Sequence, residues 1–508
     1  MTVLGAGTPA AMDRPSNAAP AIADTPTSAR GPLAVFVSSA GAGVVLSAVV
    51  ASGRPILASR WSLLGTLSAW ATVWVIAVAS ARRLPARAGL LLVLVAALAL
   101  RIAALSGPPT TSDDLYRYAW DGRVQAAGID PYRSPPAEAS LARLHEAWLW
   151  PDPAGCAALD RPPGCTRINR PAVRTIYPPV AEVWFAGISH LGGIGAHHKS
   201  WQLAGLATDV ATIGLLVVAL RRRGLDARLV ALYALCPAPV LEFVNNAHVD
   251  GLALAFVVGA LVVGLGPSTR RTAWRDLAVG ALIGAAALVK LYPALLLVAV
   301  LGLPRPHPWR SMARATGAAV ALAAVGYAPH VVAVGIRVVG YLPGYLKEEH
   351  YTKGGRFLLA GALGLTGAPA EVAAAVTLVA AVAWVASRRP ELTRGAAVLL
   401  ASLFLVATPV QPWYAISLLA VATVAGLPEA AVVVAAGYPY FFAVILDHPH
   451  TTAIGRLSYG TALAVVAGGA IVPRRRATPR STAVHASPTT AAVAATSGPP
   501  RGSRIRAR

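Results

Sequence analysis

Charged side chains are scarce in this 508-residue chain. Asp, Glu, Lys and Arg make up 13% of it, whereas 56% is hydrophobic, and the mean hydropathy is +0.58. This composition excludes a soluble protein of this size and is typical of a membrane protein with many spans. The net charge of +22 does not indicate nucleic-acid binding, because the basic residues stand in short clusters between apolar runs.

Cysteine is also rare, with three residues in the whole chain. Cys236 lies inside an apolar run and is explained as a small buried hydrophobic side chain. Cys156 and Cys165 flank a polar, proline-containing loop, CAALDRPPGC. If this loop lies outside the cytoplasm, we expect a disulfide between them; two free thiols are the alternative.

Several catalytic motifs are missing as well. The sequence has no Walker loop, GxGxxG or HExxH motif, and no GxSxG motif with partner residues. We therefore expect neither nucleotide nor zinc chemistry, and no metal or cofactor.

Apolar runs long enough to span a bilayer stand on both sides of a polar insert at 107–176. They begin near Pro32, Ser62 and Ala88, and continue near 200–220, 226–244, 249–266, 276–303, 312–329, 370–387, 394–427, 430–446 and 456–472. Lys290-Leu-Tyr-Pro293 and Gln411-Pro-Trp-Tyr414 interrupt two runs, and each interruption is predicted to join two short helices at a polar apex. The pattern predicts an all-α polytopic membrane domain of about 12–14 transmembrane helices at 32–473. Disordered cytoplasmic tails are expected at 1–31 and, rich in arginine, at 474–508.

Arginine clusters between the runs set the orientation, because such clusters belong on the cytoplasmic side. They stand at 82–83, 221–223, 270–271, 305–314, 388–389 and 474–476. The N-terminus is then inside, the insert is outside, and 178–196 must lie at the outer surface without spanning. Five polar segments should meet on the outer face: 107–176, 245–250, 290–292, 330–356 and 411–414.

The strongest candidate for chemistry is the acid pair Asp113-Asp114, directly after the third apolar run. Charges at the membrane edge are costly and usually mark a functional site. Neighbouring residues on a helix point about 100° apart, so one acid is expected to act as base and the other to orient it or bind elsewhere. Two close carboxylates should raise each other's proton affinity. The alternative is that the acids only cap the helix that follows.

Aromatic, basic, acidic and amide side chains of the outer segments are candidates for binding a sugar or its phosphate. They are Tyr116, Arg117, Arg174, Tyr177, His248, Asp250, Lys290, Tyr292, Arg356, Gln411, Trp413 and Tyr414. Interfacial anchoring is the alternative for Tyr116, Arg174 and Tyr177, and snorkelling to the interface is the alternative for Lys290. A purely structural role is the alternative for His248, and its spacing to Asp250 matches no metal motif.

The strings DDLYRYAWDGRVQAAGIDPYR, TIYPPVAEVWF, NNAHVDGLALAF, KLYPALLLV and QPWYAISLL resemble, in this order, the GT-C integral-membrane glycosyltransferases of actinobacteria. The resemblance covers roughly 90–475 and is closest to polyprenyl-phosphate-mannose-dependent mannosyltransferases and glycosyltransferase family 87. It implies a catalytic pocket on the outer face of the plasma membrane, in a large first extracytoplasmic loop at 107–176. The implied donor is a polyprenyl phosphosugar, mannose by this resemblance, and the acceptor is an envelope glycan or glycolipid.

The resemblance places the catalytic acid at Asp113 or Asp114. This carboxylate would deprotonate the acceptor hydroxyl for attack on the anomeric carbon with inversion, and the lipid phosphate would leave without a general acid. Some members of the wider superfamily use a divalent ion, but nothing in this sequence requires one. A transporter or flippase of a lipid-linked sugar is the main alternative, and an inactive scaffold for wall-polymer assembly is another.

Overall fold

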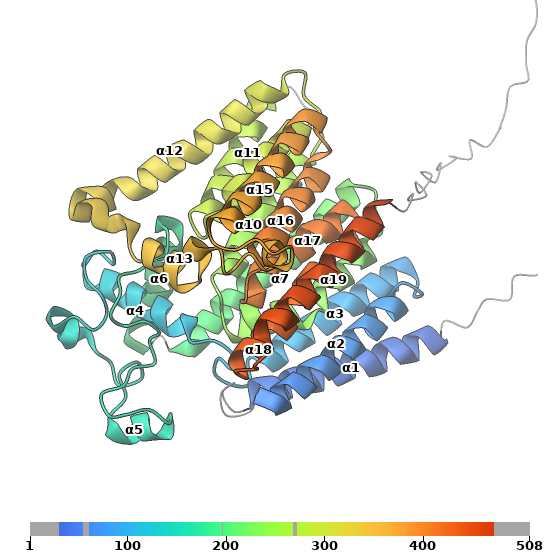
Figure 1. Ribbon diagram of the computed structural model, residues 1–508. Coiled ribbons are helices and arrows are strands. Elements are labelled where there is room, and N and C mark those ends of the chain that lie inside the picture. The colour runs from blue at the N-terminus through green and yellow to red at the C-terminus, as the bar shows by residue number, and fades with distance from the viewer. Residues whose placement is uncertain (1–29, 54–59, 196, 268–271, 472–508) are drawn as a thin grey trace, which may run out of the picture. The chain divides into compact units, whose positions relative to one another are not determined.

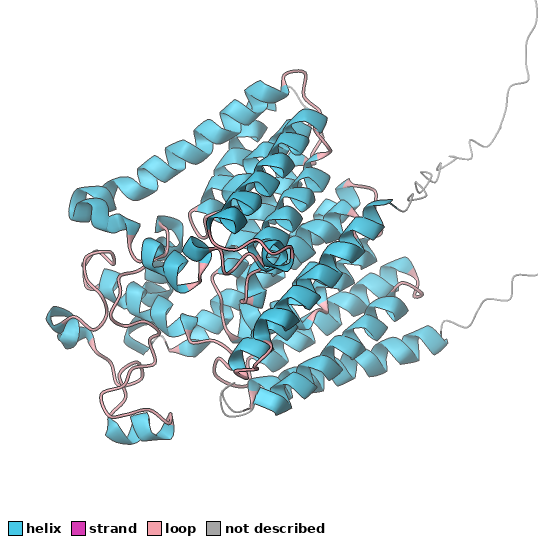
Figure 2. Ribbon diagram, in the orientation of Figure 1, coloured by secondary structure: helices cyan, strands magenta, loops and turns pink. Residues whose placement is uncertain are grey.

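The computed structural model describes residues 30–53, 60–195, 197–267 and 272–471, and within these ranges it contains helices and no strands (Figure 2). The predicted all-α, polytopic class is confirmed. The predicted tails at 1–31 and 474–508 lie outside the described residues, apart from Arg30 and Gly31 in the first helix. The described residues up to Gly469 belong to one unit of the fold.

The helices fall into four successive groups along the chain. The first group is α1 (Arg30–Ala51), α2 (Arg60–Ala81) and α3 (Ala86–Ala104). The polar insert and the segment after it form α4 (Asp114–Ala126), η2 (Ala139–Leu144), α5 (Pro153–Ala158), α6 (Pro179–Gly192) and η3 (Gly193–Gly195). The middle group is α7 (His198–Arg222), η4 (Ala227–Val230), α8 (Ala231–Ala234), α9 (Pro237–Pro239), η5 (Val240–Asn245), α10 (Asp250–Gly264), α11 (Thr272–Ala287), η6 (Tyr292–Gly302) and α12 (Pro308–Val334). The last group is η7 (Gly335–Val339), α13 (Leu342–Glu348), η8 (Tyr351–Lys353), α14 (Leu358–Ala362), α15 (Ala368–Arg388), α16 (Leu392–Ala407), η9 (Pro412–Ala415), α17 (Ile416–Ala425), η10 (Pro428–Ala430), α18 (Ala431–Ile445) and α19 (Thr451–Ile471).

The long helices pack side by side (Figure 1). Helix α1 packs on α2 and α3, α10 packs on α7 and α11, α11 packs on α12, and α16 packs on α15 and α17. Large apolar side chains on these helices are exposed on the outside, for example Leu91, Val325 and Val376. A helix that is apolar on its outward face suits a lipid environment, because lipid does not penalise that exposure.

Seven helices in the described residues are long and apolar enough to cross a membrane, or eight if the bent pair Ala227–Ala234 and Pro237–Asn245 forms one span. This number is below the predicted 12–14. The reason is that four further apolar runs form helices of only 10–17 residues: Asp250–Gly264, Tyr292–Gly302, Leu392–Ala407 and Pro412–Ala425. The segment predicted not to span contains α6, which has 14 residues and is not among the candidate spans.

Both predicted interruptions are present. Helix α11 ends at Ala287 and η6 begins at Tyr292, so Lys290 lies in the break. Helix α16 ends at Ala407 and η9 begins at Pro412, so Gln411 lies in the second break. Each break places polar side chains between two apolar helices.

Helices α4, α6 and α13 lie together at one end of the long helices (left in Figure 1). A separate hydrophobic cluster rich in aromatic residues supports this end. In it the Tyr118 ring stacks on Phe185 with centroids 4.6 Å apart and meets Tyr177 edge-on at 5.1 Å. This cluster fixes α4, and therefore the acid pair at its start.

Loops that carry different arginine clusters also contact one another. Arg228 donates to the carbonyl oxygen of Arg82 at 3.1 Å, Arg223 pairs with Glu391, and Arg389 lies 5.6 Å from the centroid of the Trp309 ring. These contacts agree with the prediction that the loops share one side. The clusters at 270–271 and 474–476 lie outside the described residues.

Candidate active site

The two adjacent acids have different surroundings. Asp113 precedes α4, its side chain is 47% exposed, and its Oδ2 lies 3.0 Å from Arg161 Nη2. Asp114 begins α4, and its side chain is only 19% exposed. Asp114 Oδ1 accepts a hydrogen bond from Asn169 Nδ2 at 2.6 Å. The two side chains diverge as helix geometry requires, and of the two, the side chain of Asp114 points to the buried His248.

Neither acid caps α4 with its side chain. The Asp113 side chain makes no capping hydrogen bond, and the backbone N–H of Asp114 donates instead to the Ser112 hydroxyl at 3.2 Å. The negative charges still favour the helix start electrostatically. Capping by hydrogen bonds is therefore supplied by Ser112 and leaves both carboxylates free for other contacts.

His248 lies beside Asp114 and is fully buried. Its Nδ1 is 3.5 Å from Asp114 Oδ2, and its ring stacks on Trp413 with centroids 4.0 Å apart. The preceding residue, Ala247, has a φ of +51°, a backbone conformation that side chains other than glycine rarely adopt. Such strained positions often occur at functional sites.

A second buried acid, Glu242, lies on the other side of His248. Glu242 Oε2 is 3.5 Å from His248 Nε2 and accepts a hydrogen bond from Asn246 Nδ2 at 2.9 Å. Glu242 belongs to η5, a π-helix, and this irregular form is frequent at functional sites. Asp114, His248 and Glu242 therefore form a carboxylate–imidazole–carboxylate row.

The Lys290 ammonium completes the group. Its Nζ lies 3.4 Å from Asp250 Oδ2 and 5.3 and 5.1 Å from the ring centroids of Tyr177 and Tyr414. Both carboxylate oxygens of Asp250 are buried and have no hydrogen-bond partner among the described residues. We call Asp114, Glu242, His248, Asp250 and Lys290 the Asp114 cluster.

The electrostatics of Asp114 differ from the sequence expectation. Burial alone would raise its pKa, but the hydrogen bond and charge of His248, the charge of Lys290 and the hydrogen bond from Asn169 outweigh burial. Together they lower the pKa of Asp114 from 3.8 to about 2. The prediction of a raised proton affinity is wrong, because Asp114 faces cations and donors, and the neighbouring acid points elsewhere.

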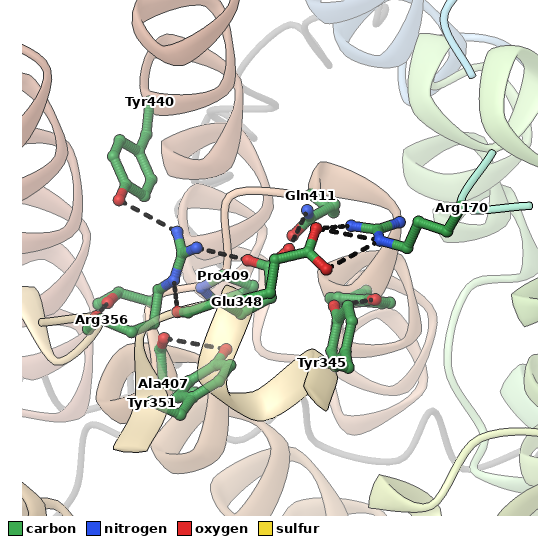
Figure 3. A network of polar contacts seen from close by, with 12 residues as sticks. Arg170, Tyr345, Glu348, Tyr351, Arg356, Ala407, Pro409, Gln411 and Tyr440 are labelled. Atoms are coloured by element: carbon green, nitrogen blue, oxygen red, sulfur yellow. Dashed lines mark hydrogen bonds and ion pairs between the residues drawn. The ribbon is translucent and has the colours of Figure 1, made fainter. Parts of the chain in front are cut away.

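Figure 3 shows a second network of polar contacts. Arg356 pairs with Glu349 and donates to the Tyr440 hydroxyl at 3.1 Å. Gln411 Nε2 donates to the other Glu349 oxygen at 3.1 Å. We call Arg356, Glu349, Gln411 and Tyr440 the Arg356 network.

Helix α13 links the two groups. The Tyr345 hydroxyl lies 2.9 Å from that of Tyr414, whose ring contacts Lys290. Glu348 faces Arg170 of the polar insert and accepts two of its hydrogen bonds at 3.0 Å (Figure 3). The five polar segments that were predicted to meet are therefore in contact.

Some predicted binding residues have their contacts elsewhere. Tyr116 packs against Trp148, with ring centroids 5.8 Å apart. Arg117 forms a buried pair with Asp121 at 3.1 Å, and Arg174 donates to the carbonyl oxygen of Arg133 at 3.2 Å. Tyr292 meets Phe404 edge-on at 5.5 Å, and Arg356 and Gln411 belong to the neighbouring network. Of the predicted set, the structure gathers Tyr177, His248, Asp250, Lys290, Trp413 and Tyr414 around Asp114.

Two residues of the site were not predicted. Glu242 carried a usable signal, since it is an acid inside an apolar run. Asn169 carried none, because it is one polar residue in a polar loop.

The insert is held by a disulfide between Cys156 and Cys165, with Cα atoms 5.8 Å apart, and Cys236 is a buried free thiol. The loop that the disulfide closes carries Arg161, the partner of Asp113. In the described part of the chain, no group of three or more His, Cys, Asp or Glu side chains is placed to hold a metal ion.

Residues 175–409 match the family model of glycosyltransferase family 87. No curated protein and no solved structure matches the chain. The matched range contains Glu242, His248, Asp250 and Lys290, whereas Asp113 and Asp114 precede it. The chain therefore contains a glycosyltransferase family 87 domain, and the activity that this family indicates is the transfer of a sugar.

Proposed function

We propose that this protein is an inverting glycosyltransferase of the plasma membrane. It moves mannose from a polyprenyl-phosphate donor to an envelope glycan or glycolipid on the outer face. The observation that carries the proposal is the Asp114 cluster, in which three carboxylates, one imidazole and one ammonium group meet beside two tyrosine rings. Nucleic acid has no part in this function.

The chemistry follows from the positions of the charges. Lys290 binds the donor phosphate, and the acceptor hydroxyl lies against Asp114. The hydroxyl oxygen attacks the anomeric carbon, the bond from that carbon to the phosphate oxygen breaks, and its electron pair stays on the leaving phosphate. The hydroxyl proton passes to Asp114, so one carboxylate suffices where a retaining hydrolase needs two.

The pKa of Asp114 is low when no donor is bound in the site. Asp114 is then ionised throughout the physiological pH range and is ready to accept a hydrogen bond from the hydroxyl. Lys290 is one of the charges that lower this pKa, and a bound phosphate neutralises Lys290. Donor binding therefore raises the proton affinity of Asp114 when a base is needed.

Glu242 and Trp413 hold His248 in place. Trp413 stacks on the imidazole ring, and Glu242 faces the nitrogen opposite to the one near Asp114. A carboxylate behind an imidazole fixes the orientation of the ring. His248 is therefore assigned the role of orienting Asp114.

The test uses membranes that contain the wild type or the Asp113→Ala/Asp114→Ala double variant. They receive radiolabelled polyprenyl-phosphate-mannose and a short mannoside acceptor, and the label in acceptor and in each leaflet is counted. Acceptor labelling by the wild type alone supports the proposal. Movement of labelled donor across the bilayer without acceptor labelling would instead identify a flippase.

A further inference from the structure

A small polar pocket lies beside the crossing of α4 and α6, apart from the Asp114 cluster. Its volume is about 270 Å³, and its polar lining comes from Arg123, Glu146, Trp148, Ser189 and His190. The two helices approach closely at Gly122, where any side chain would collide with Ser189 Oγ. The wall of the pocket is therefore set by a fixed helix crossing. We call this space the α4–α6 pocket.

The charges in the α4–α6 pocket cancel. Arg123 Nη2 lies 2.8 Å from Glu146 Oε1, and these side chains are 30% and 21% exposed. Glu146 Oε2 accepts a hydrogen bond from Trp148 Nε1 at 2.8 Å. Because Arg123 is already paired with Glu146, it attracts a phosphate only weakly. A ligand with several hydroxyl groups can instead use both the donors and the acceptors of the pocket.

The remaining features also fit a sugar ring. Arg123 Nε is buried and has no hydrogen-bond partner among the described residues, so one donor is left over. Trp148 adds an indole ring to the lining, and aromatic rings pack on the apolar C–H faces of sugars. The volume falls just below the usual range of about 300–1,000 Å³ for ligand pockets, which suits one monosaccharide unit.

The position of the pocket relates it to the transfer site. Arg123 follows Asp114 by nine residues, or about 14 Å along the axis of α4, and lies on nearly the opposite side of that helix. Trp148 contacts Tyr116 one turn below the exposed pair of Asp113 and Arg161. Tyr116 is buried and Trp148 lines the pocket, so this aromatic contact joins the start of α4 to the pocket.

We propose that the α4–α6 pocket binds a neutral sugar unit of the acceptor glycan, several units away from the one that receives the new sugar. This inference rests on the proposed function, because it assumes a saccharide acceptor. Binding of this remote sugar unit makes the enzyme prefer an oligosaccharide acceptor over a single sugar. The preference is expressed in the acceptor KM and leaves the chemical step unchanged.

Two variants test the pocket. Ala126→Trp fills it from an exposed helix position, and Ala127→Trp, on the next residue, is the matched control that does not line it. Arg123→Gln/Glu146→Gln removes both charges together and leaves no charge unpaired. We expect Ala126→Trp and the double variant to raise the KM for a mannose tetrasaccharide acceptor about tenfold, equivalent to about 1.4 kcal/mol. The KM for methyl mannoside, the kcat and the Ala127→Trp variant should not change.

A binding measurement separates this inference from the proposed function. Tetrasaccharide binding is measured by saturation-transfer NMR on the Asp114→Asn protein, with and without Ala126→Trp. Loss of binding with Ala126→Trp supports the pocket, even if the wild type transfers no mannose. A wild type that transfers no mannose would overturn only the proposed reaction. Two equalities would overturn the pocket: equal binding by the Asp114→Asn proteins with and without Ala126→Trp, and an equal tetrasaccharide KM for the wild type and the Ala126→Trp enzyme.

Discussion

The Asp114 cluster and the Arg356 network are neighbouring groups of buried charges that differ in how fully they are paired. In the Arg356 network, Arg356 donates to Glu349 and Tyr440, and Gln411 satisfies the other Glu349 oxygen. In the Asp114 cluster, both Asp250 oxygens and His248 Nε2 have no hydrogen-bond partner among the described residues. A saturated network stabilises a fold, whereas buried groups left without hydrogen bonds are costly and indicate a place for a ligand.

This difference predicts that changes in the Asp114 cluster reduce transfer and that changes in the Arg356 network reduce stability. The largest effect is expected for Asp114→Asn, which keeps the shape of the side chain and removes the base. We expect the kcat to fall about 10³-fold, within the range for loss of a general base. The measurement is mannose transfer per folded molecule in purified, detergent-solubilised protein.

Asp113→Asn is the matched control for Asp114→Asn. Asp113 is exposed, and within the described part of the chain its ion pair is with Arg161 of the insert, so the kcat of Asp113→Asn should stay within about threefold of the wild type. If Asp113→Asn lost as much activity as Asp114→Asn, the division of roles between the two acids would be wrong.

A smaller loss is expected for Lys290→Met, which removes the cation assigned to the donor phosphate. A hydrogen bond to a charged group contributes about 1.5–3 kcal/mol, so kcat/KM for the donor should fall about 100-fold. The single variant leaves Asp250 buried without its cation. Lys290→Met/Asp250→Asn is therefore made as well, and it should restore the thermal stability while activity stays low. Recovery of activity in the double variant would contradict a role in phosphate binding.

Glu242→Gln should have an intermediate effect, because Glu242 acts through His248. Loss of orientation should lower the kcat roughly tenfold and leave the donor KM unchanged. A purely structural role would lower the unfolding temperature instead, so thermal unfolding is measured on the same sample. Glu242→Asp, which keeps the charge, should recover part of the kcat.

The smallest effect on transfer is expected for Glu349→Ala in the Arg356 network. Removing one member of a buried pair should destabilise the protein by about 3–5 kcal/mol, while the activity of each folded molecule changes little. Glu349→Gln/Arg356→Met should regain most of the stability, because no charge remains unpaired. A loss of transfer like that of Lys290→Met, in folded protein, would place the Arg356 network in the site.

Much of the arrangement could be predicted because membrane proteins carry strong signals. Apolar runs predicted the order of the long helices, and the polar breaks at 290–293 and 411–414 are present. Helix geometry predicted that Asp113 and Asp114 would diverge. The described residues contain fewer helices of spanning length than predicted, because a run of apolar residues does not reveal where a helix is cut short.

The remaining features depend on contacts across the fold. The pKa of Asp114 is set by His248, Lys290 and Asn169, which are distant in sequence. No spacing rule relates them, so the sequence could not give the direction of the shift. Arg117 looked like a binding residue, yet it meets Asp121 one turn further along α4 and is buried.

The anomeric configuration of the product tests most directly whether Asp114 acts as a base. Mannose is transferred by the wild type from a donor of known configuration, and the new linkage is assigned by NMR. A base that activates the acceptor hydroxyl predicts inversion at the anomeric carbon. Retention would mean that a carboxylate, Asp114 or another, attacks the sugar itself, and this would contradict the single displacement described above.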